Sequence, residues 1–127
     1  MARPLVYVAG PISRGCIVTN CRLAFTTAVR LMAAGITPVV PHGSCFWGNA
    51  ITAEGAFRPE ALPHGTAPED WYEMDLELVR RCDAVLRLPG LSRGADLEVA
   101  EARERGVPVL YDVESVLEWA RWHTPAG

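Results

Sequence analysis

Residues 84–100 read AVLRLPGLSRGADLEVA, and this stretch decides the fold. The apolar run at 84–88 is typical of a buried strand. A loop of small residues follows it and leads into an amphipathic stretch that ends at Gly106. We therefore expect a strand, a turn and a helix N-terminus in direct succession. Such a junction gathers free backbone N–H groups and the positive end of a helix dipole, which suits a phosphate or a sugar oxygen.

The rest of the chain repeats this alternation of apolar runs and amphipathic stretches. The pattern predicts strands at 5–9, 36–40, 83–88 and 108–111, and helices at 19–34, 68–81, 92–106 and 112–122. Alternating strands and helices favour an open parallel sheet with helices on both faces. We predict an α/β fold of the flavodoxin-like or Rossmann-like type, with strand order 2-1-3-4 and possibly a fifth short strand. Residues 1–127 form one domain in this interpretation.

The predicted strand order places a ligand crevice between the first and third strands. Ligands of open α/β sheets bind where the strand order reverses, at the carboxyl ends of the strands. The two loops expected there, residues 10–15 and 89–94, both contain Ser-Arg-Gly. A third segment, residues 41–65, is irregular and longer than an ordinary connection. We expect it to be a lid or a substrate-contacting loop.

Two carboxylates interrupt or border apolar helix faces. Asp75 lies at the centre of the apolar stripe of the helix at 68–81, where an unpaired charge is unfavourable. Glu98 borders the stripe of the next helix, and Tyr7 on the first strand is a candidate hydrogen-bond partner for one of the two. Paired carboxylates suggest acid–base or nucleophilic chemistry of the kind used at glycosidic bonds. Each residue also fits a purely structural role. Asp75 fits a residue that caps a neighbouring loop, Glu98 fits a first-turn glutamate favoured by the helix dipole, and Tyr7 fits core packing.

Composition restricts the possible partners and the compartment. The formal net charge of −3 gives no electrostatic reason to expect binding to a nucleic acid polymer or a membrane. The first residues contain no signal-peptide pattern, and no apolar stretch is long enough to span a bilayer, so we expect a cytoplasmic protein. No cysteine pair has the C-x-x-C spacing. We expect reduced thiols, no metal and no cofactor.

Four short patterns occur in order along the chain. They are YVAGPI at 7–12, Asn20 with Ala24-Phe25, Asp75 followed by Asp83-Ala84-Val85, and Ser92-x-Gly94-x-x-x-Glu98. Together they resemble the nucleoside 2-deoxyribosyltransferase-like family, which includes N-glycosidases of deoxynucleoside and nucleoside 5′-monophosphates. The resemblance covers most of the chain.

The resemblance implies a function and a set of roles. It implies cleavage of the N-glycosidic bond of a nucleoside or nucleoside 5′-monophosphate, by hydrolysis or by transfer of the sugar to another base. Glu98 would attack the anomeric carbon, Asp75 would orient the sugar or protonate the leaving base, and Tyr7 would hold Glu98. Ser92 and the backbone of the first loop would bind a 5′-phosphate. A homodimer or homotetramer would complete the site with a neighbouring subunit.

The predicted site residues therefore fall into two groups. The catalytic residues are Glu98, Asp75 and Tyr7. The predicted substrate contacts are Gly10, Pro11, Ile12, Ser13, Arg14, Asn20, His42, Trp47, Trp71, Ser92 and Gly94. Of these, His42, Trp47 and Trp71, together with Phe46, are candidates to border the base, although each also fits ordinary packing.

Three alternative functions share this fold class. The chain also fits a nucleotide-binding or signalling module of the same fold without catalysis. A cytokinin-activating phosphoribohydrolase is disfavoured, because its P-G-G-x-G-T pattern is absent from the sequence. A flavin-binding flavodoxin is disfavoured because the first loop lacks a Ser/Thr-rich phosphate cradle.

Overall fold

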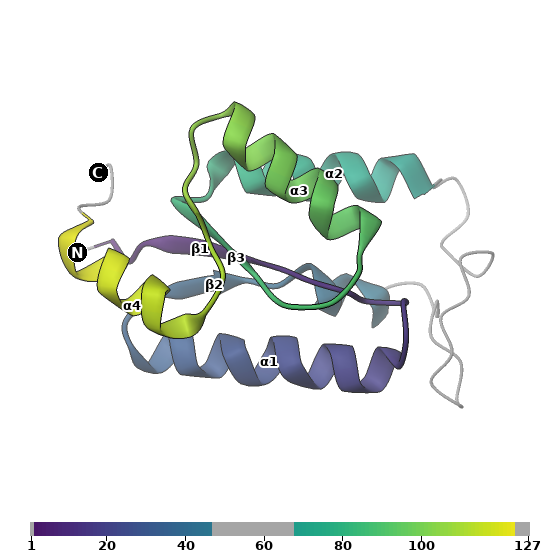
Figure 1. The fold of residues 1–127 in the computed structure, drawn as a ribbon, viewed down its shortest axis with the longest axis horizontal. Coiled ribbons are helices and arrows are strands. Elements are labelled where there is room, and N and C mark those ends of the chain that lie inside the picture. Colours follow the sequence, from purple (N-terminus) through teal and green to yellow (C-terminus); the bar gives the residue numbers. More distant parts are fainter. Residues whose placement is uncertain (1, 47–67, 124–127) are drawn as a thin grey trace.

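The structure is a computed structural model that describes residues 2–46 and 68–123. Strands and helices alternate along the chain (Figure 1). The elements are β1 (Leu5–Ala9), α1 (Ile17–Ala33), β2 (Thr37–Val39), a 3₁₀ helix η1 (Pro41–Phe46), α2 (Pro68–Arg81), β3 (Ala84–Arg87), α3 (Arg93–Glu104), β4 (Val109–Leu110) and α4 (Val113–Trp122). No helix in these two ranges combines the length and the hydrophobicity needed to cross a membrane.

The strands form one parallel sheet in the order β2-β1-β3-β4. This confirms the predicted fold class and the predicted order. Helices α2 and α3 lie side by side on one face of the sheet, and α1 and α4 cover the other (Figure 1). The direction in which successive strands are added therefore reverses between β1 and β3. The loops that follow these two parallel strands lie at the same, carboxyl end of the sheet. Within the described residues the sheet has four strands.

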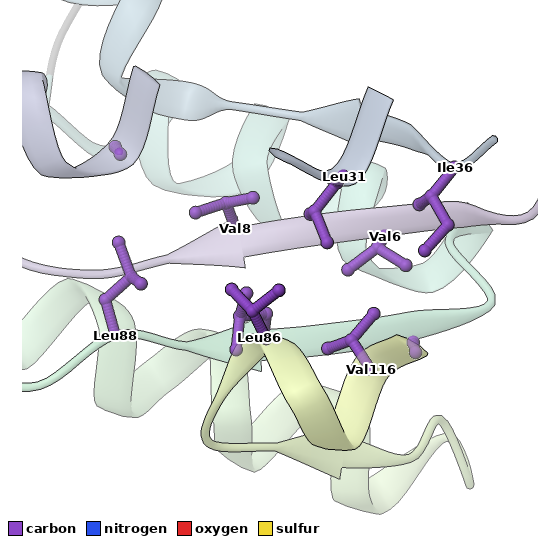
Figure 2. Packing of buried hydrophobic residues seen from close by; sticks show 10 residues of the cluster. Val6, Val8, Leu31, Ile36, Leu86, Leu88 and Val116 are labelled. Carbon is purple, nitrogen blue, oxygen red and sulfur yellow. The ribbon is translucent and has the colours of Figure 1, made fainter. Parts of the chain in front are cut away.

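The α1/α4 face is a mainly apolar layer. Side chains alternate along a strand, so Val6 and Val8 of β1 point to this face together with Leu86 of β3. They pack with Leu31 of α1 and Val116 of α4 (Figure 2). Burying each of these side chains stabilises the fold by about 1.5–3 kcal/mol. Helices cover both faces of the sheet, which explains why the central strands β1 and β3 are apolar on both faces except for Arg87 at the end of β3.

The α2/α3 face has a different composition, because small and polar side chains enter it. Ala95 and Ala102 of α3 are buried against the sheet, and Tyr7 of β1 is buried between them and α2. The two helices are also joined by Arg80 of α2, which forms an ion pair with Glu101 of α3 at 2.5 Å. This ion pair joins α2, which carries Asp75, to α3, which carries Glu98.

Several element boundaries differ from the predicted ones, and β3 lacks one predicted residue at each end. Helix α1 begins at Ile17, two residues before the predicted start, because Ile17 is a core side chain and the helix extends to bury it. Strands β2 and β4 are shorter than predicted. Both lie at the edges of the sheet and pair with a single neighbour, so fewer ladder hydrogen bonds define their ends.

Most of the predicted lid at 41–65 lies outside the described residues. Its beginning is η1, which follows β2 directly. Trp47, a predicted substrate contact, lies outside the described residues.

Candidate active site

The three predicted catalytic side chains meet between the sheet and the α2/α3 pair. The hydroxyl of Tyr7, in the middle of β1, donates a hydrogen bond to Oε2 of Glu98 on α3. Both side chains are buried, with Tyr7 fully enclosed and Glu98 7% exposed. Asp75 on α2 lies close enough for its charge to raise the pKa of both. A strand and two helices thus bring one hydroxyl and two carboxyl groups into a single cluster.

The start of α3 determines where Glu98 points. Ser92 caps this helix, because its Oγ accepts a hydrogen bond from the backbone N–H of Ala95 at 3.1 Å. Glu98 follows Ala95 by three residues and precedes Ala102 by four, and both alanines are buried. Residues at this spacing share one helix face, so Glu98 lies on the face that packs on the sheet.

Burial controls the protonation of this cluster. It raises the pKa of Glu98 from 4.5 to about 8, and the charge of Asp75 adds to the rise, whereas the Tyr7 hydrogen bond opposes it. Burial also raises the pKa of Asp75 to about 6. The pKa of Tyr7 is raised first by burial and then by the Glu98 charge, so the hydroxyl stays protonated and remains a donor. Near neutral pH the two carboxyl groups therefore hold about one proton between them.

Asp75 has unused hydrogen-bonding capacity. Its Oδ1 is buried and has no hydrogen-bond partner within the described part of the chain. A buried carboxyl oxygen without a partner is unfavourable by about 1–3 kcal/mol. A ligand hydroxyl or a ring N–H placed beside Glu98 would satisfy it, so this atom is suited to substrate binding.

Arg87, the last residue of β3, is a site residue that the sequence analysis missed. Its neighbours Leu86 and Leu88 belong to the opposite core layer, so alternation along the strand directs Arg87 toward the α2/α3 face. Its side chain is 12% exposed and pairs with Asp96 of α3 at 3.1 Å. Its positive charge lowers the pKa of Glu98. The available signal was a single arginine within an otherwise apolar strand.

The loops after β1 and β3 touch each other. Gly90 has a φ of +111°, and a Cβ atom added there would lie 2.8 Å from Cγ of Pro11. A Cβ atom on Gly10 would lie 3.0 Å from Cβ of Leu88. The two loops predicted to border the crevice are therefore adjacent, and glycine permits their close approach.

Two predicted substrate contacts outside the first loop, Asn20 and His42, bind its backbone carbonyl groups. Asn20 Nδ2 donates hydrogen bonds to the carbonyl oxygens of Ile12 at 3.0 Å and Arg14 at 2.8 Å. His42 is fully buried, and its Nε2 lies 3.0 Å from the carbonyl oxygen of Pro11. Asn20 and His42 thus shape the loop backbone from two sides. Their predicted contact with substrate stays a prediction.

The remaining predicted contacts are spread over the loop tip, α2 and α3. Ser13 and Arg14 are exposed on the first loop. Gly94 lies in the first turn of α3, where an added Cβ atom would be 3.5 Å from the Tyr72 ring of α2. Trp71 is half-buried on α2. Base stacking by Trp71 also stays a prediction.

Metal-binding potential was considered for the same region. Among residues 2–46 and 68–123, no group of three or more His, Cys, Asp or Glu side chains is placed to hold a metal ion. The described cysteines Cys16, Cys21 and Cys82 are free thiols.

Comparisons with known proteins agree with this architecture. Among the solved structures, the chain is similar to a 2-deoxyribosyltransferase from the psychrotolerant bacterium Bacillus psychrosaccharolyticus. The two chains share 18% sequence identity with a TM-score of 0.57, over 83% of this chain and 69% of the other. At this identity the likeness establishes a common fold. No curated protein matches the sequence. Residues 4–111 match the family described as Domain of unknown function (DUF4406), and because this match spans most of the chain, the protein belongs to that family.

Proposed function

We propose that the protein cleaves the N-glycosidic bond of a nucleoside or nucleoside 5′-monophosphate, with Glu98 as the nucleophile. The observation that carries this proposal is the buried cluster in which Tyr7 donates to Glu98 and Asp75 lies beside them. The cluster lies beside the strand-order reversal, where α/β folds bind small ligands. The fold shared with a 2-deoxyribosyltransferase is consistent with this chemistry.

The first step forms a covalent sugar ester. An oxygen of the Glu98 carboxylate bonds to the anomeric carbon as the carbon–nitrogen bond to the base breaks. The departing base takes the bonding electron pair and receives the proton of the Asp75 carboxyl group. A nearby carboxylate stabilises the positive charge that develops on the sugar ring, and more strongly in a dry site than in water.

The second step regenerates the enzyme. Water, or the nitrogen of a second base, attacks the anomeric carbon and displaces the Glu98 carboxylate. The proton lost by the attacking group returns to Asp75, so the pair again holds one proton. Two steps of moderate difficulty replace one difficult displacement. Hydrolysis and transfer differ only in the acceptor that enters the site.

The proton on the carboxyl pair must move for this chemistry to start. The pKa values of about 8 for Glu98 and about 6 for Asp75 place the proton mainly on Glu98 in the free protein. The reaction needs it on Asp75. The Tyr7 hydrogen bond and the Arg87 charge both favour ionised Glu98 and so reduce this cost. A substrate that hydrogen-bonds to Asp75 as an acceptor would favour the same shift.

The substrate's phosphate or sugar oxygens would bind at the adjoining loops. The first loop exposes Ser13 and Arg14, and the N-terminus of α3 follows the second loop. The Ser92 hydroxyl oxygen accepts the hydrogen bond that caps α3, and its O–H group is still available to donate. These groups suit a 5′-phosphate or a 5′-hydroxyl.

A second candidate is a nucleotide-binding module without catalysis. The raised pKa of Glu98 favours it, because a protonated carboxyl group is a poor nucleophile. The same site would then bind a nucleotide and release no base.

One experiment separates the two candidates. Purified protein is incubated with ribo- and deoxyribonucleosides and their 5′-monophosphates, with and without a second free base, and released or exchanged base is measured by chromatography. Glu98→Ala should abolish the release, whereas Glu104→Ala, an exposed carboxylate on the same helix, should not. Base release that persists in Glu98→Ala would contradict the mechanism. A substrate that raises the melting temperature but yields no base would favour the binding module.

The proposal extends to the assembly and location of the protein. We propose a homodimer or homotetramer, as the family resemblance implies, and a location in the cytoplasm. Light scattering on the purified protein would give the oligomeric state, and a monomer with full activity would contradict a shared site.

A further inference from the structure

Arg87 is a charged side chain in the otherwise apolar strand β3. It is the last residue of β3, and its side chain is only 12% exposed. The residues before and after it, Leu86 and Leu88, are in the hydrophobic core. An arginine at such a position is unfavourable unless acceptors and counter-charges surround it. In the structure, two backbone carbonyl groups and one carboxylate surround the guanidinium group.

The guanidinium joins three consecutive segments of the chain. It donates to the carbonyl oxygen of Leu88 at the strand end and to that of Gly90 in the loop, at 2.9 Å for Gly90. It also donates to Oδ1 of Asp96 in the first turn of α3, at 3.1 Å. One side chain therefore fixes the strand end, the following loop and the helix that carries Glu98. The planar fork of arginine makes this possible, and a lysine ammonium lacks that geometry.

The loop held in this way is the one that contacts the first loop. Gly90 adopts its positive φ of +111° directly against Pro11. The Gly90 carbonyl bond to Arg87 therefore helps to hold the two crevice loops together. Loss of the bond would free residues 89–94 to move relative to residues 10–11.

The same side chain contributes charge to the site. Glu98 is faced by Tyr7 from β1, by Asp75 from α2 and by Arg87 from β3, and Cys82 lies near the Tyr7 hydroxyl. Tyr7 and Cys82 are neutral when protonated, and Asp75 disfavours a second negative charge. Arg87 supplies positive charge to this group, so it favours the ionised form of Glu98.

We propose that Arg87 is a positioning residue of this site, which holds loop 89–94 and the first turn of α3 in place against the first loop. Its contacts with Leu88, Gly90 and Asp96 occupy it within the protein, so its action on substrate is indirect. The catalytic consequence rests on the proposed function.

The charge effect is tested without turnover. The pKa of Glu98 is measured by NMR on protein with ¹³C-labelled glutamate, with Glu98→Gln used to assign the signal. Arg87→Met should raise this pKa by about 0.5 or more, because a nearby positive charge is removed. Arg87→Lys should keep the wild-type value to within about 0.2, since lysine retains the charge. Arg105→Met removes an arginine that pairs with Glu101 on the same helix, and should leave the pKa unchanged.

The loop effect has its own readout. Amide hydrogen exchange across residues 90–94 should become about ten-fold faster or more in both Arg87→Met and Arg87→Lys. Methionine has no donor, and the single ammonium nitrogen of lysine cannot reproduce the planar fork that reaches these separated acceptors. Arg105→Met should not alter it. In an active protein, Arg87→Lys should raise KM more than it lowers kcat, and Arg87→Met should in addition move the pH profile upward.

The outcomes separate this inference from the proposed function. No base release by the wild-type protein would overturn the function, while the pKa and exchange measurements would still test Arg87. Unchanged exchange in both variants would overturn the positioning role even in an active enzyme, and an unchanged Glu98 pKa in Arg87→Met would overturn the charge effect. If Arg87→Met does not fold, Arg87→Gln, which is neutral and keeps a donor, takes its place with the same expected shifts.

Discussion

Glu98 is buried and has a raised pKa, so Glu98→Gln should stabilise the protein while abolishing its activity. Glutamine has nearly the shape of protonated glutamate, and its carbonyl oxygen still accepts the hydrogen bond from Tyr7. It cannot ionise and it cannot form an ester with a sugar. The substitution therefore removes the energetic cost of ionising a buried carboxyl group, and the nucleophile with it.

The stabilisation follows from the two pKa values of Glu98, 4.5 ordinarily and about 8 in the folded protein. Because the folded-state pKa is raised, the contribution of Glu98 to the free energy of unfolding is fully present below pH 4.5. This contribution is lost progressively as the pH rises through 8. Each unit between the two values corresponds to about 1.4 kcal/mol, so the total approaches about 5 kcal/mol at pH 9. At pH 7 the loss is about 3 kcal/mol, and at pH 5 it is about 1 kcal/mol. The variant avoids this loss.

The assay is urea denaturation of both proteins at pH 5, 7 and 9. The difference in unfolding free energy should grow with pH in favour of Glu98→Gln, and base release should fall by about 10³-fold or more. Any constant effect of the amide group cancels in this comparison. Glu104→Gln on the exposed side of α3 is the control and should give a pH-independent difference. A pH-independent difference for Glu98→Gln as well would refute the reasoning that burial raises its pKa.

Three further predictions concern the site and its loops. Base release should peak between about pH 6 and 8, because Asp75 and Glu98 must share one proton, and a rate that keeps rising above pH 8 would exclude Asp75 as the acid. Asn20→Ala removes both hydrogen bonds to the first loop, so it should lower the free energy of unfolding by about 1–2 kcal/mol in thermal denaturation and raise KM. An unchanged KM would show that this loop does not contribute to substrate binding. Gly90→Ala should destabilise the protein by about 1–3 kcal/mol in urea denaturation, because φ is +111° and the new Cβ atom would lie 2.8 Å from Cγ of Pro11. A variant as stable as the wild-type protein would show that the loop relaxes.

Much of the fold was predictable because its signals are local. Apolar runs such as residues 84–88 and the amphipathic stretches between them recur along the chain, and strand alternation and helix periodicity follow from backbone geometry. Right-handed crossovers then limit the possible orders, and the order β2-β1-β3-β4 agrees with the prediction. The boundaries of α1 and of the edge strands were less accurate, because burial of Ile17 and single-sided pairing are properties of the packed structure.

The sequence indicated candidate residues for the site, but only part of the contacts between them. Asp75 was singled out because it interrupts an apolar helix face, and Glu98 because it borders one, and both features are visible in the sequence. Arg87 was overlooked because a strand tolerates single polar residues. Asn20 was predicted as a substrate contact, and its side chain amide supports the first loop from within α1.

The sequence by itself determined the alternation of elements, the parallel sheet and the two unusual carboxylates, since these depend on residue type and short-range periodicity. Only the tertiary structure decided which atoms meet. Tyr7 and Glu98 are 91 residues apart, and their hydrogen bond exists because β1 and α3 pack on each other in one arrangement. The raised pKa values have the same origin, because desolvation depends on what surrounds a side chain and not on its neighbours in sequence.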